Sequence, residues 1–210
     1  MPSVFDIHAI VALQERWAEI RGDLALFKLH FTDEAIPEAL LNEWHASLAA
    51  DGIEIRGGWT LSPPSTPLVG VTFDDEPSDE QVLGSFARYD GADEVLSMIT
   101  RQTVTIRSWA PNMEISRGLR VLLRNMMMVS TRWFADLGYG EVYYLGGGDL
   151  RPEEAMSAEQ LGTWIQSQRW AAIGESSATI PNAVTHKPPF VAAEDTVVDG
   201  FPGGVSPWET

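Results

Sequence analysis

The feature that most constrains this chain is an alternating segment that leads directly into a long amphipathic one. Residues 96–109 alternate in polarity around Val104 and Ile106, which predicts a β-strand with one buried face. Pro111 cannot extend that strand, and the side chain of Asn112 can cap a helix. The junction therefore predicts a strand that ends where a helix begins.

Residues 113–137 are predicted to form that helix, which Gly138 and Gly140 would end. At 100° per residue its apolar side chains fall on one broad face, formed by Ile115, Leu119, Leu122, Leu123, Met126, Trp133, Phe134 and Leu137. Such a face has to be buried. We therefore expect an α+β fold, in which an antiparallel or mixed β-sheet packs against one long amphipathic helix.

Weaker patterns place further elements around this pair. Helices are expected near residues 4–22 and 38–50, and a strand over 23–32. Further strands are expected within 53–73, where two flank a Pro-rich loop, and at 82–88, 142–145 and 163–172. The 82–88 and 96–109 strands read as a hairpin linked through Asp90–Glu94, and Gly146–Gly148 reads as a flexible turn.

Three regions follow from this layout. Residues 1–52 are expected to form a helical segment packed on the core, and residues 53–178 the α+β core domain. Residues 179–210 are rich in Pro and Gly and have no periodic apolar pattern, which predicts an extended C-terminal arm. Its expected anchors on a neighbouring subunit are the large apolar side chains Phe190, Phe201 and Trp208.

Composition excludes several classes of function. The chain has no cysteine, which excludes disulfides, thiol catalysis and sulfur-based metal sites. No apolar run approaches the ~20 residues that span a bilayer, so we expect no membrane contact and a cytosolic setting. The net charge of −16 argues against general nucleic-acid binding, because such binding needs a basic surface. That charge is compatible with a protein past which DNA slides.

No residue pattern carries catalysis. The four histidines, which include His8, His30 and His45, are not spaced as metal ligands, and no nucleophile elbow or phosphate loop occurs. We therefore expect neither an enzyme nor a metal or cofactor. A more distant alternative is a soluble enzyme with an acid-based site at Asp74, Asp75 and Glu76, or one that uses His30 or His45.

Opposite charges occupy neighbouring segments. Residues 73–96 carry −7, from Arg88 and the eight acids Asp74, Asp75, Glu76, Asp79, Glu80, Asp90, Asp93 and Glu94. Residues 101–132 carry +5, from six arginines and Glu114. Four of those arginines lie opposite the apolar face of the predicted helix: Arg117, Arg120, Arg124 and Arg132.

This arginine stripe has two interpretations. It can be a solvated face whose guanidinium groups pair with acids of the same subunit. Alternatively it can meet the acids of residues 74–80 on the next subunit, because guanidinium groups bind carboxylates in a two-pronged geometry. The second contact is head-to-tail and can close a ring, with Asp90, Asp93 and Glu94 at its rim or lumen.

The arrangement resembles the small α+β neck and tail-completion proteins of tailed bacteriophages, including the tail-terminator fold. The resemblance covers roughly residues 60–178. It rests on the junction Gln102–Leu123 (QTVTIRSWAPNMEISRGLRVLL), the preceding strand PLVGVTF and the closing strand TWIQSQRWAA. The longer N-terminal part and the Pro-rich tail depart from the shortest members of that family.

The resemblance implies a non-enzymatic virion protein that forms a ring, commonly a hexamer. Its partners would be copies of itself and the tail-tube, sheath and head-connector proteins, and genome DNA would pass through the ring without specific binding. The nearest alternative is a head–tail adaptor or a baseplate component. An acidic mimic of nucleic acid is a third class, against which the arginine stripe argues.

Overall fold

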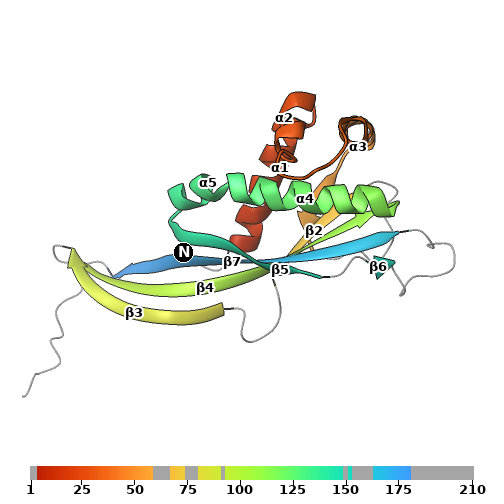
Figure 1. Cartoon of the computed structure of the whole chain (residues 1–210). Coiled ribbons are helices and arrows are strands. Elements are labelled where there is room, and N and C mark those ends of the chain that lie inside the picture. The colour runs from red at the N-terminus through yellow and green to blue at the C-terminus, as the bar shows by residue number, and fades with distance from the viewer. Residues whose placement is uncertain are drawn as a thin grey trace, which may run out of the picture.

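A layer of helices covers part of a long, curved β-sheet (Figure 1). The computed structural model describes residues 4–58, 67–73, 80–90, 93–148, 151–152 and 163–180. Its helices are α1 (Phe5–Ile20), α2 (Leu24–Leu29), α3 (Glu38–Asp51), α4 (Met113–Val129) and α5 (Thr131–Asp136). Its strands are β1 (Glu54–Gly57), β2 (Leu68–Phe73), β3 (Glu80–Asp90), β4 (Asp93–Ala110), β5 (Tyr139–Gly147), β6 (Arg151–Pro152) and β7 (Trp164–Ile180).

Strands β4 and β7 are the spine of the sheet. They pair antiparallel along almost their whole length, from Glu94 opposite Ile180 to Ala110 opposite Trp164. The other edge of β4 is shared, because β3 pairs with its first half and β2 with its second half. Strand β1 adds to β2 in parallel, and β5 and β6 pair with β7. The mixed sheet and the α+β class predicted from the sequence are both confirmed.

Helix α4 packs on the face of the sheet that carries the even-numbered side chains of β4. Val104 and Ile106 lie on that face, and their partners on β7 include Trp170. The apolar side of α4 closes on them with Leu119 and Leu122, both fully buried. Hydrocarbon burial of this kind is the main favourable term in folding, at about 25 cal/mol for each Å² removed from water.

The N-terminal helices join the same core. Phe5 packs its ring against Phe134 and Tyr139, with ring centroids 5.6 and 5.4 Å apart. The backbone N–H of Phe5 donates to the Gln102 side chain at 3.3 Å, which ties α1 to the middle of β4. The helical segment expected over residues 1–52 therefore shares one hydrophobic core with the sheet.

One predicted strand is a helix. Residues 23–32 were expected to be extended, but Leu24–Leu29 form α2. The Asp23 carboxylate caps this helix by accepting the N–H groups of Ala25 and Leu26 at 2.8 and 3.0 Å. An N-terminal cap of this type stabilises a helix by roughly 1 kcal/mol, and it outweighs the β-preference of the alternating apolar residues.

The long helix expected over residues 113–137 is divided in two. Helix α4 ends at Val129, and α5 begins at Thr131. Between them the Ser130 hydroxyl donates to the carbonyl of Met126 at 2.8 Å. A serine that bonds back to the carbonyl four residues earlier bends or ends a helix. Arg132 therefore lies on a different helix from the other three arginines of the stripe.

Smaller differences concern the ends of strands. Gly146 and Gly147 were expected in a turn, but they belong to β5 and pair with Arg169 and Gln168. Glu80, expected in a loop, is the first residue of β3. Strand β7 runs to Ile180, past the domain boundary expected at residue 178. Backbone pairing with a long neighbour extends these strands further than their side-chain patterns indicate.

Several expected residues lie outside the described ones. These are the acids Asp74, Asp75, Glu76 and Asp79 and the arm anchors Phe190, Phe201 and Trp208. None of the helices in the described ranges is both long and apolar enough to cross a lipid bilayer.

The contact between α3 and α4 gives a test of the packing. A Cβ atom added at Gly118 would lie 2.6 Å from Cε3 of Trp44, which is a steric overlap. We expect Gly118→Ala to lower the free energy of unfolding by about 1–3 kcal/mol, although alanine is the better helix former. Urea unfolding measures this difference. Gly22→Ala is the control, because nothing lies within 4 Å of its added Cβ. Equal stability of the two variants would contradict the packing described.

Candidate functional site

Helix α4 brings three arginines into one open hollow. The Asn112 side chain caps the helix by accepting the N–H of Ile115 at 2.8 Å, which sets where the first turn begins. Counting from that cap, three guanidinium groups leave the helix on the side away from its buried leucines. The hollow has a volume of about 330 Å³ and is lined by Glu34, Arg117, Arg120, Val121, Arg124 and Gln166. We call it the arginine hollow.

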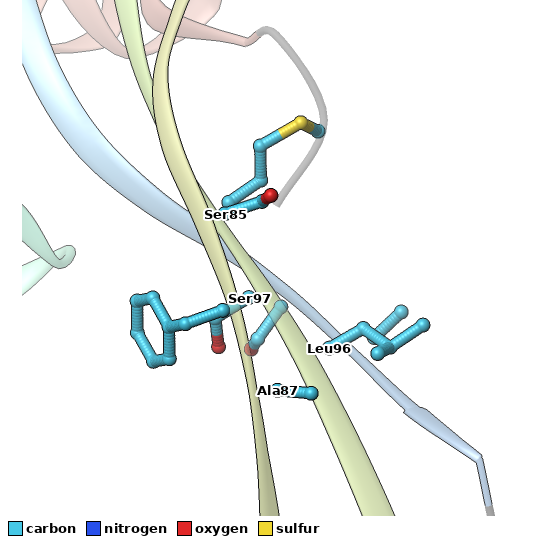
Figure 2. A pocket seen from close by; sticks show the side chains of 8 residues that line it. Ser85, Ala87, Leu96 and Ser97 are labelled. Carbon is cyan, nitrogen blue, oxygen red and sulfur yellow. The ribbon is translucent and has the colours of Figure 1, made fainter. Parts of the chain in front are cut away.

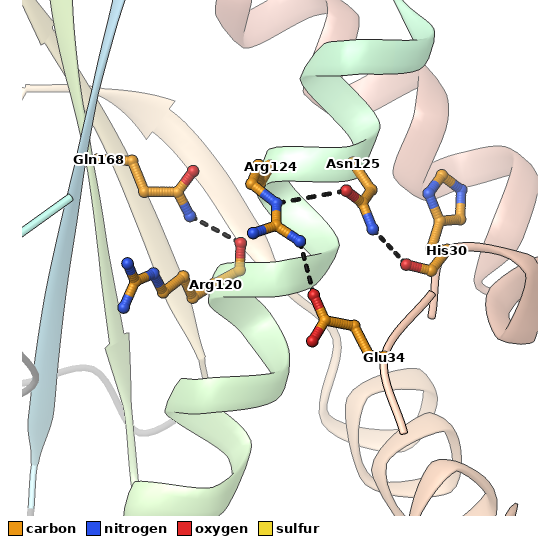
Figure 3. Close-up of polar contacts among 6 residues, drawn as sticks. All are labelled: His30, Glu34, Arg120, Arg124, Asn125 and Gln168. Carbon is orange, nitrogen blue, oxygen red and sulfur yellow. Dashed lines mark hydrogen bonds and ion pairs between the residues drawn. The ribbon is translucent and has the colours of Figure 1, made fainter. Parts of the chain in front are cut away.

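Arg124 has its counter-ion within the same chain. Its Nη2 lies 2.7 Å from Oε1 of Glu34, and its Nε donates to Oδ1 of Asn125 at 3.4 Å (Figure 3). Asn125 in turn donates to the carbonyl of His30, so α4 holds the segment that follows α2. Arg124 therefore pairs with an acid of its own subunit, as the first interpretation of the stripe expects.

Arg120 points the other way, toward the sheet (Figure 3). Its backbone carbonyl accepts the side-chain N–H of Gln168 at 2.7 Å. In the amide orientation that satisfies both ends of Gln166, its oxygen accepts from Nη1 of Arg120 at 3.0 Å and its nitrogen donates to the carbonyl of Ser116 at 3.2 Å. The absence of a side chain at Gly147 lets Nη2 of Arg120 come close, since a Cβ there would be 3.2 Å away. Arg120 thus meets neutral acceptors rather than a carboxylate.

Arg117 and Arg132 are exposed. Among the described residues, no carboxylate oxygen lies within 4.0 Å of Arg117, Arg120 or Arg132. The arginine hollow therefore holds three guanidinium groups and one carboxylate, an excess of two positive charges in a chain of net charge −16. Such a site suits an anionic oxygen group, which arginine forks bind in two-pronged geometry.

The structure changes the membership of the predicted site. It brings together Arg117, Arg120 and Arg124 and separates Arg132. It adds Glu34 and Gln166, which sequence reasoning missed. For Gln166 a signal existed, since it alternates with Trp164 and Gln168 on the buried face of β7. Glu34 lies in an irregular segment that has no period to detect.

The second candidate surface is the part of the sheet that extends past the helices (Figure 1). It comprises β3 with residues 93–99 of β4 and 175–180 of β7, and we call it the wing. None of its described residues belongs to the main hydrophobic cluster, although the side chain of Val95 is buried. Its exposed large apolar side chains are Leu83, Phe86, Leu96 and Met98.

A shallow hollow of about 540 Å³ lies on the wing, lined by Ser85, Phe86, Ala87, Leu96, Ser97, Met98, Ser177 and Ala178. Figure 2 shows the labelled members along the paired strands β3 and β4. Leu96 and Met98 remain 43% and 39% exposed, whereas Ser97 between them is buried. The lining is small or apolar and has no charged group, so it suits packing rather than chemistry.

The acids at the end of the hairpin are close neighbours. Asp90 is directly opposite Asp93 in the ladder, and Glu94 follows opposite Tyr89. Like charges placed directly opposite each other destabilise a sheet. We call Asp90, Asp93 and Glu94 the wing tip.

The three histidines in the described ranges lie apart from the arginine hollow. The Nδ1 of His8 is hydrogen-bonded to the Tyr139 hydroxyl at 2.9 Å, and His45 packs its ring on Phe27 at 5.0 Å. None of His8, His30 and His45 lines the arginine hollow. Within the described ranges, no three acids or histidines are grouped so that they could hold a metal ion.

The sequence matches no protein-family model, and no curated protein matches it.

Two histidines make stability depend on pH. Burial lowers the pKa of His8 below its ordinary 6.5, against a smaller opposing effect of Asp6. Burial also lowers the pKa of His30 from 6.5, and the positive charge of Arg16 lowers it further by a smaller amount. The unfolded chain therefore binds more protons near pH 6. The stabilisation that comes from keeping the two buried rings neutral is therefore complete above pH 6.5, and it is lost as the pH falls below that value.

We expect the urea concentration at the midpoint of unfolding to be lower at pH 5.5 than at pH 7.5. The difference should be smaller in a His8→Gln/His30→Gln variant. Unfolding curves at the two pH values measure this. A midpoint that rises on acidification would contradict the burial of these rings.

Proposed function

We propose that this chain is a structural, non-enzymatic protein of a tailed-bacteriophage virion. Copies assemble into a ring at the neck or tail end, a hexamer as the resemblance implies. The ring joins the tail tube to the head connector and lets genome DNA pass. The observation that carries this proposal is the wing, a three-stranded extension of the sheet that no described element covers.

The wing has the properties of an assembly surface. Leu96 and Met98 are exposed on one face of it and Phe86 on the other, because Phe86 is opposite Ser97 in the ladder. Large apolar side chains exposed on one element are typical of a surface that binds something. In the described part of the chain, β3 pairs only with β4, so its outer edge carries unpaired backbone groups. Exposed strand edges of this length are ready to pair with another chain.

The net charge of the chain suits a ring through which DNA passes. Each copy adds a net charge of −16, so a ring of copies carries a strongly negative field that repels phosphate. Counter-ion release, which drives general DNA binding, needs many lysines and arginines against the backbone, and this chain has 14 of them against 30 acids. DNA would therefore pass without being bound.

The remaining parts of the proposal follow the resemblance. The arm, which would follow the end of β7 at Ile180, would lie on a neighbouring subunit through Phe190, Phe201 and Trp208. The further partners would be tail-tube, sheath and head-connector proteins, and the place of action would be the virion, assembled in the host cytoplasm. No cofactor takes part.

Assembly of the purified full chain tests the proposal. We expect light scattering after size exclusion to give a mass several times the 23.1 kDa of one chain, and electron microscopy to show closed rings with a central opening. A species that stays at 23.1 kDa at every concentration would overturn the proposal.

The role of the wing is tested by a variant with Leu96→Lys and Met98→Lys. We expect it to keep the circular dichroism of the folded chain and to lose the assembled species, because two charges cannot be buried in an apolar contact. The control is Leu29→Lys on α2, where the native side chain is 67% exposed and lies outside the wing. Equal assembly of both variants would show that the wing is not the contact.

A further inference from the structure

We propose that residues 187–193 of one copy bind along the wing of the next copy. In this contact Phe190 packs over Leu96 and Met98. The inference rests on the proposed function, because it joins two parts of it, the assembly surface on the wing and the C-terminal arm. It names the segment of the arm and the face of the wing that meet.

The face of the wing that carries Leu96 and Met98 is a ridge between small neighbours. In the ladder, Ala87 and Ala178 lie on either side of Leu96, and Ser85 is opposite Met98. Both ridge side chains are exposed, and the residues that line the hollow of about 540 Å³ around them are all uncharged. An extended apolar segment can therefore lie along this ridge without burying a charge of the wing.

A segment with matching chemistry follows the end of β7. Residues 181–210 come after Ile180, and within them residues 188–193 (PPFVAA) are uncharged and carry one aromatic ring, that of Phe190. The two consecutive prolines favour the extended polyproline II conformation. Such a segment loses little conformational entropy on binding, and proline-rich segments bind apolar grooves in this conformation.

Charge sets the direction of this segment on the wing. Apart from Asp93, which already has an interaction, the wing carries acids at Asp90, Glu94 and Glu175 against one cation, Arg88. The uncharged segment is preceded by a lysine at position 187 and followed by acids at positions 194 and 195. The lysine is therefore expected at the acidic tip and the two acids away from it, since opposite charges fix the register of a contact.

The longer stretches outside the described residues do not reach this face. Residues 59–66, 149–150 and 153–162 are held at both ends beside the opposite half of the sheet. The nearest of these ends is level with Ile106, which is eight residues or roughly 26 Å from Met98 along β4. A stretch of ten residues held at both ends extends at most about 20 Å.

The shorter stretches begin nearer but do not match the ridge. Residues 74–79 hold four acids and no large apolar side chain, and residues 91–92 are Gly and Ala. Residues 1–3 extend at most about 10 Å, whereas Leu96 is roughly 20 Å along β4 from Gln102, where α1 begins. The C-terminal arm is therefore the part of this sequence that can cover the ridge.

The direction of β7 favours the arm of another copy over the arm of the same chain. Strand β7 runs toward the wing tip, where Ile180 is opposite Glu94, so the chain leaves the wing at its outer end. Continued in that direction, the arm carries Phe190 roughly 33 Å beyond its own sheet. A return to the same wing requires the chain to reverse within residues 181–186, whereas contact with a neighbour requires no reversal.

The resulting contact joins two different surfaces. Each copy has one arm and one wing, so every subunit can both give and receive. Such head-to-tail contacts close into a ring when the rotation between copies allows it. Apolar burial of Phe190 supplies the affinity, and the lysine before it sets the orientation.

The absence of cysteine allows a direct test by disulfide cross-linking of the full chain. One copy carries Phe190→Cys, and a second, tagged copy carries Met98→Cys. After mixing and mild oxidation we expect a linked pair that contains one chain of each kind, because a disulfide needs two Cβ atoms within about 4.5 Å. The control replaces Met98→Cys by Leu29→Cys, which is exposed on α2 outside the wing and should not link to the arm.

Assembly of arm variants is the second measurement. Phe190→Asp should weaken assembly at least tenfold in native mass spectrometry, because a carboxylate cannot be buried against Leu96 and Met98. Lys187→Glu should weaken assembly by a smaller factor, which shrinks at high salt. The matched control is Val184→Asp, which places the same charge in the same arm before the binding segment and should assemble like the unchanged chain. All three variants should keep the circular dichroism of the folded chain.

Two results would overturn the inference and leave the ring standing. If a chain with both Phe190→Cys and Met98→Cys links within itself while the mixture of single variants stays unlinked, the arm lies on its own wing. If no link forms and Phe190→Asp assembles like the unchanged chain, the arm does not meet this face. An unchanged chain that stays at 23.1 kDa at every concentration removes both this inference and the proposed function.

Discussion

The continuous pairing of β4 with β7 supports everything else in this structure. Over the stretch from Glu94 to Ala110 the two strands are locked in one register, which places Val104, Ile106 and Trp170 on the same face. Helix α4 needs such a surface, since its apolar side would otherwise be in water. The short connection through Asn112 returns the chain from the end of β4 directly onto this face. Shifting the register by one residue would turn every one of these side chains away from the helix.

The same ladder explains why a wing exists. The two strands are longer than the helical layer, so their far half has backbone partners but no helix above it (Figure 1). Backbone hydrogen bonds hold this extension together, because Leu96 and Met98 contribute no buried contact to the core. An uncovered sheet of this kind can aggregate with other chains. Proteins prevent this by placing charges at the end of the sheet or by covering its face with a partner. The acids of the wing tip and the apolar hollow beside them are consistent with both.

The arginine hollow depends on the two layers meeting. Its cations come from α4, its one carboxylate from the segment after α2, and its amide from β7. A helix face alone would present four arginines to solvent. The sheet brings Gln166 and the close backbone of Gly147 against Arg120, and the N-terminal segment brings Glu34 against Arg124. These contacts divide the arginines into one that pairs with Glu34, two with no carboxylate within 4.0 Å among the described residues, and one on α5.

Sequence periodicity was sufficient to predict an element wherever one of its faces is buried and the other is exposed to solvent. The strand around Val104, the apolar side of α4 and the hairpin of β3 with β4 were all predictable, because burial leaves a period of 2.0 or 3.6 residues in the pattern. Prediction failed where a single polar contact decides the backbone. Asp23 makes a helix of an apparent strand, and Ser130 ends a helix whose apolar pattern continues past it.

The sequence by itself determined the α+β class, the order of the main elements and the separation of acidic from basic segments. These are properties of residue order, and local propensity and solvation act on neighbours along the chain. Only the tertiary structure decided which arginines share a hollow, which of them finds Glu34, and how far the sheet extends beyond its helices. Those outcomes depend on contacts between residues far apart in the sequence, such as Glu34 and Arg124, which are ninety positions apart. No local pattern encodes such a distance, because it arises only when the core is packed.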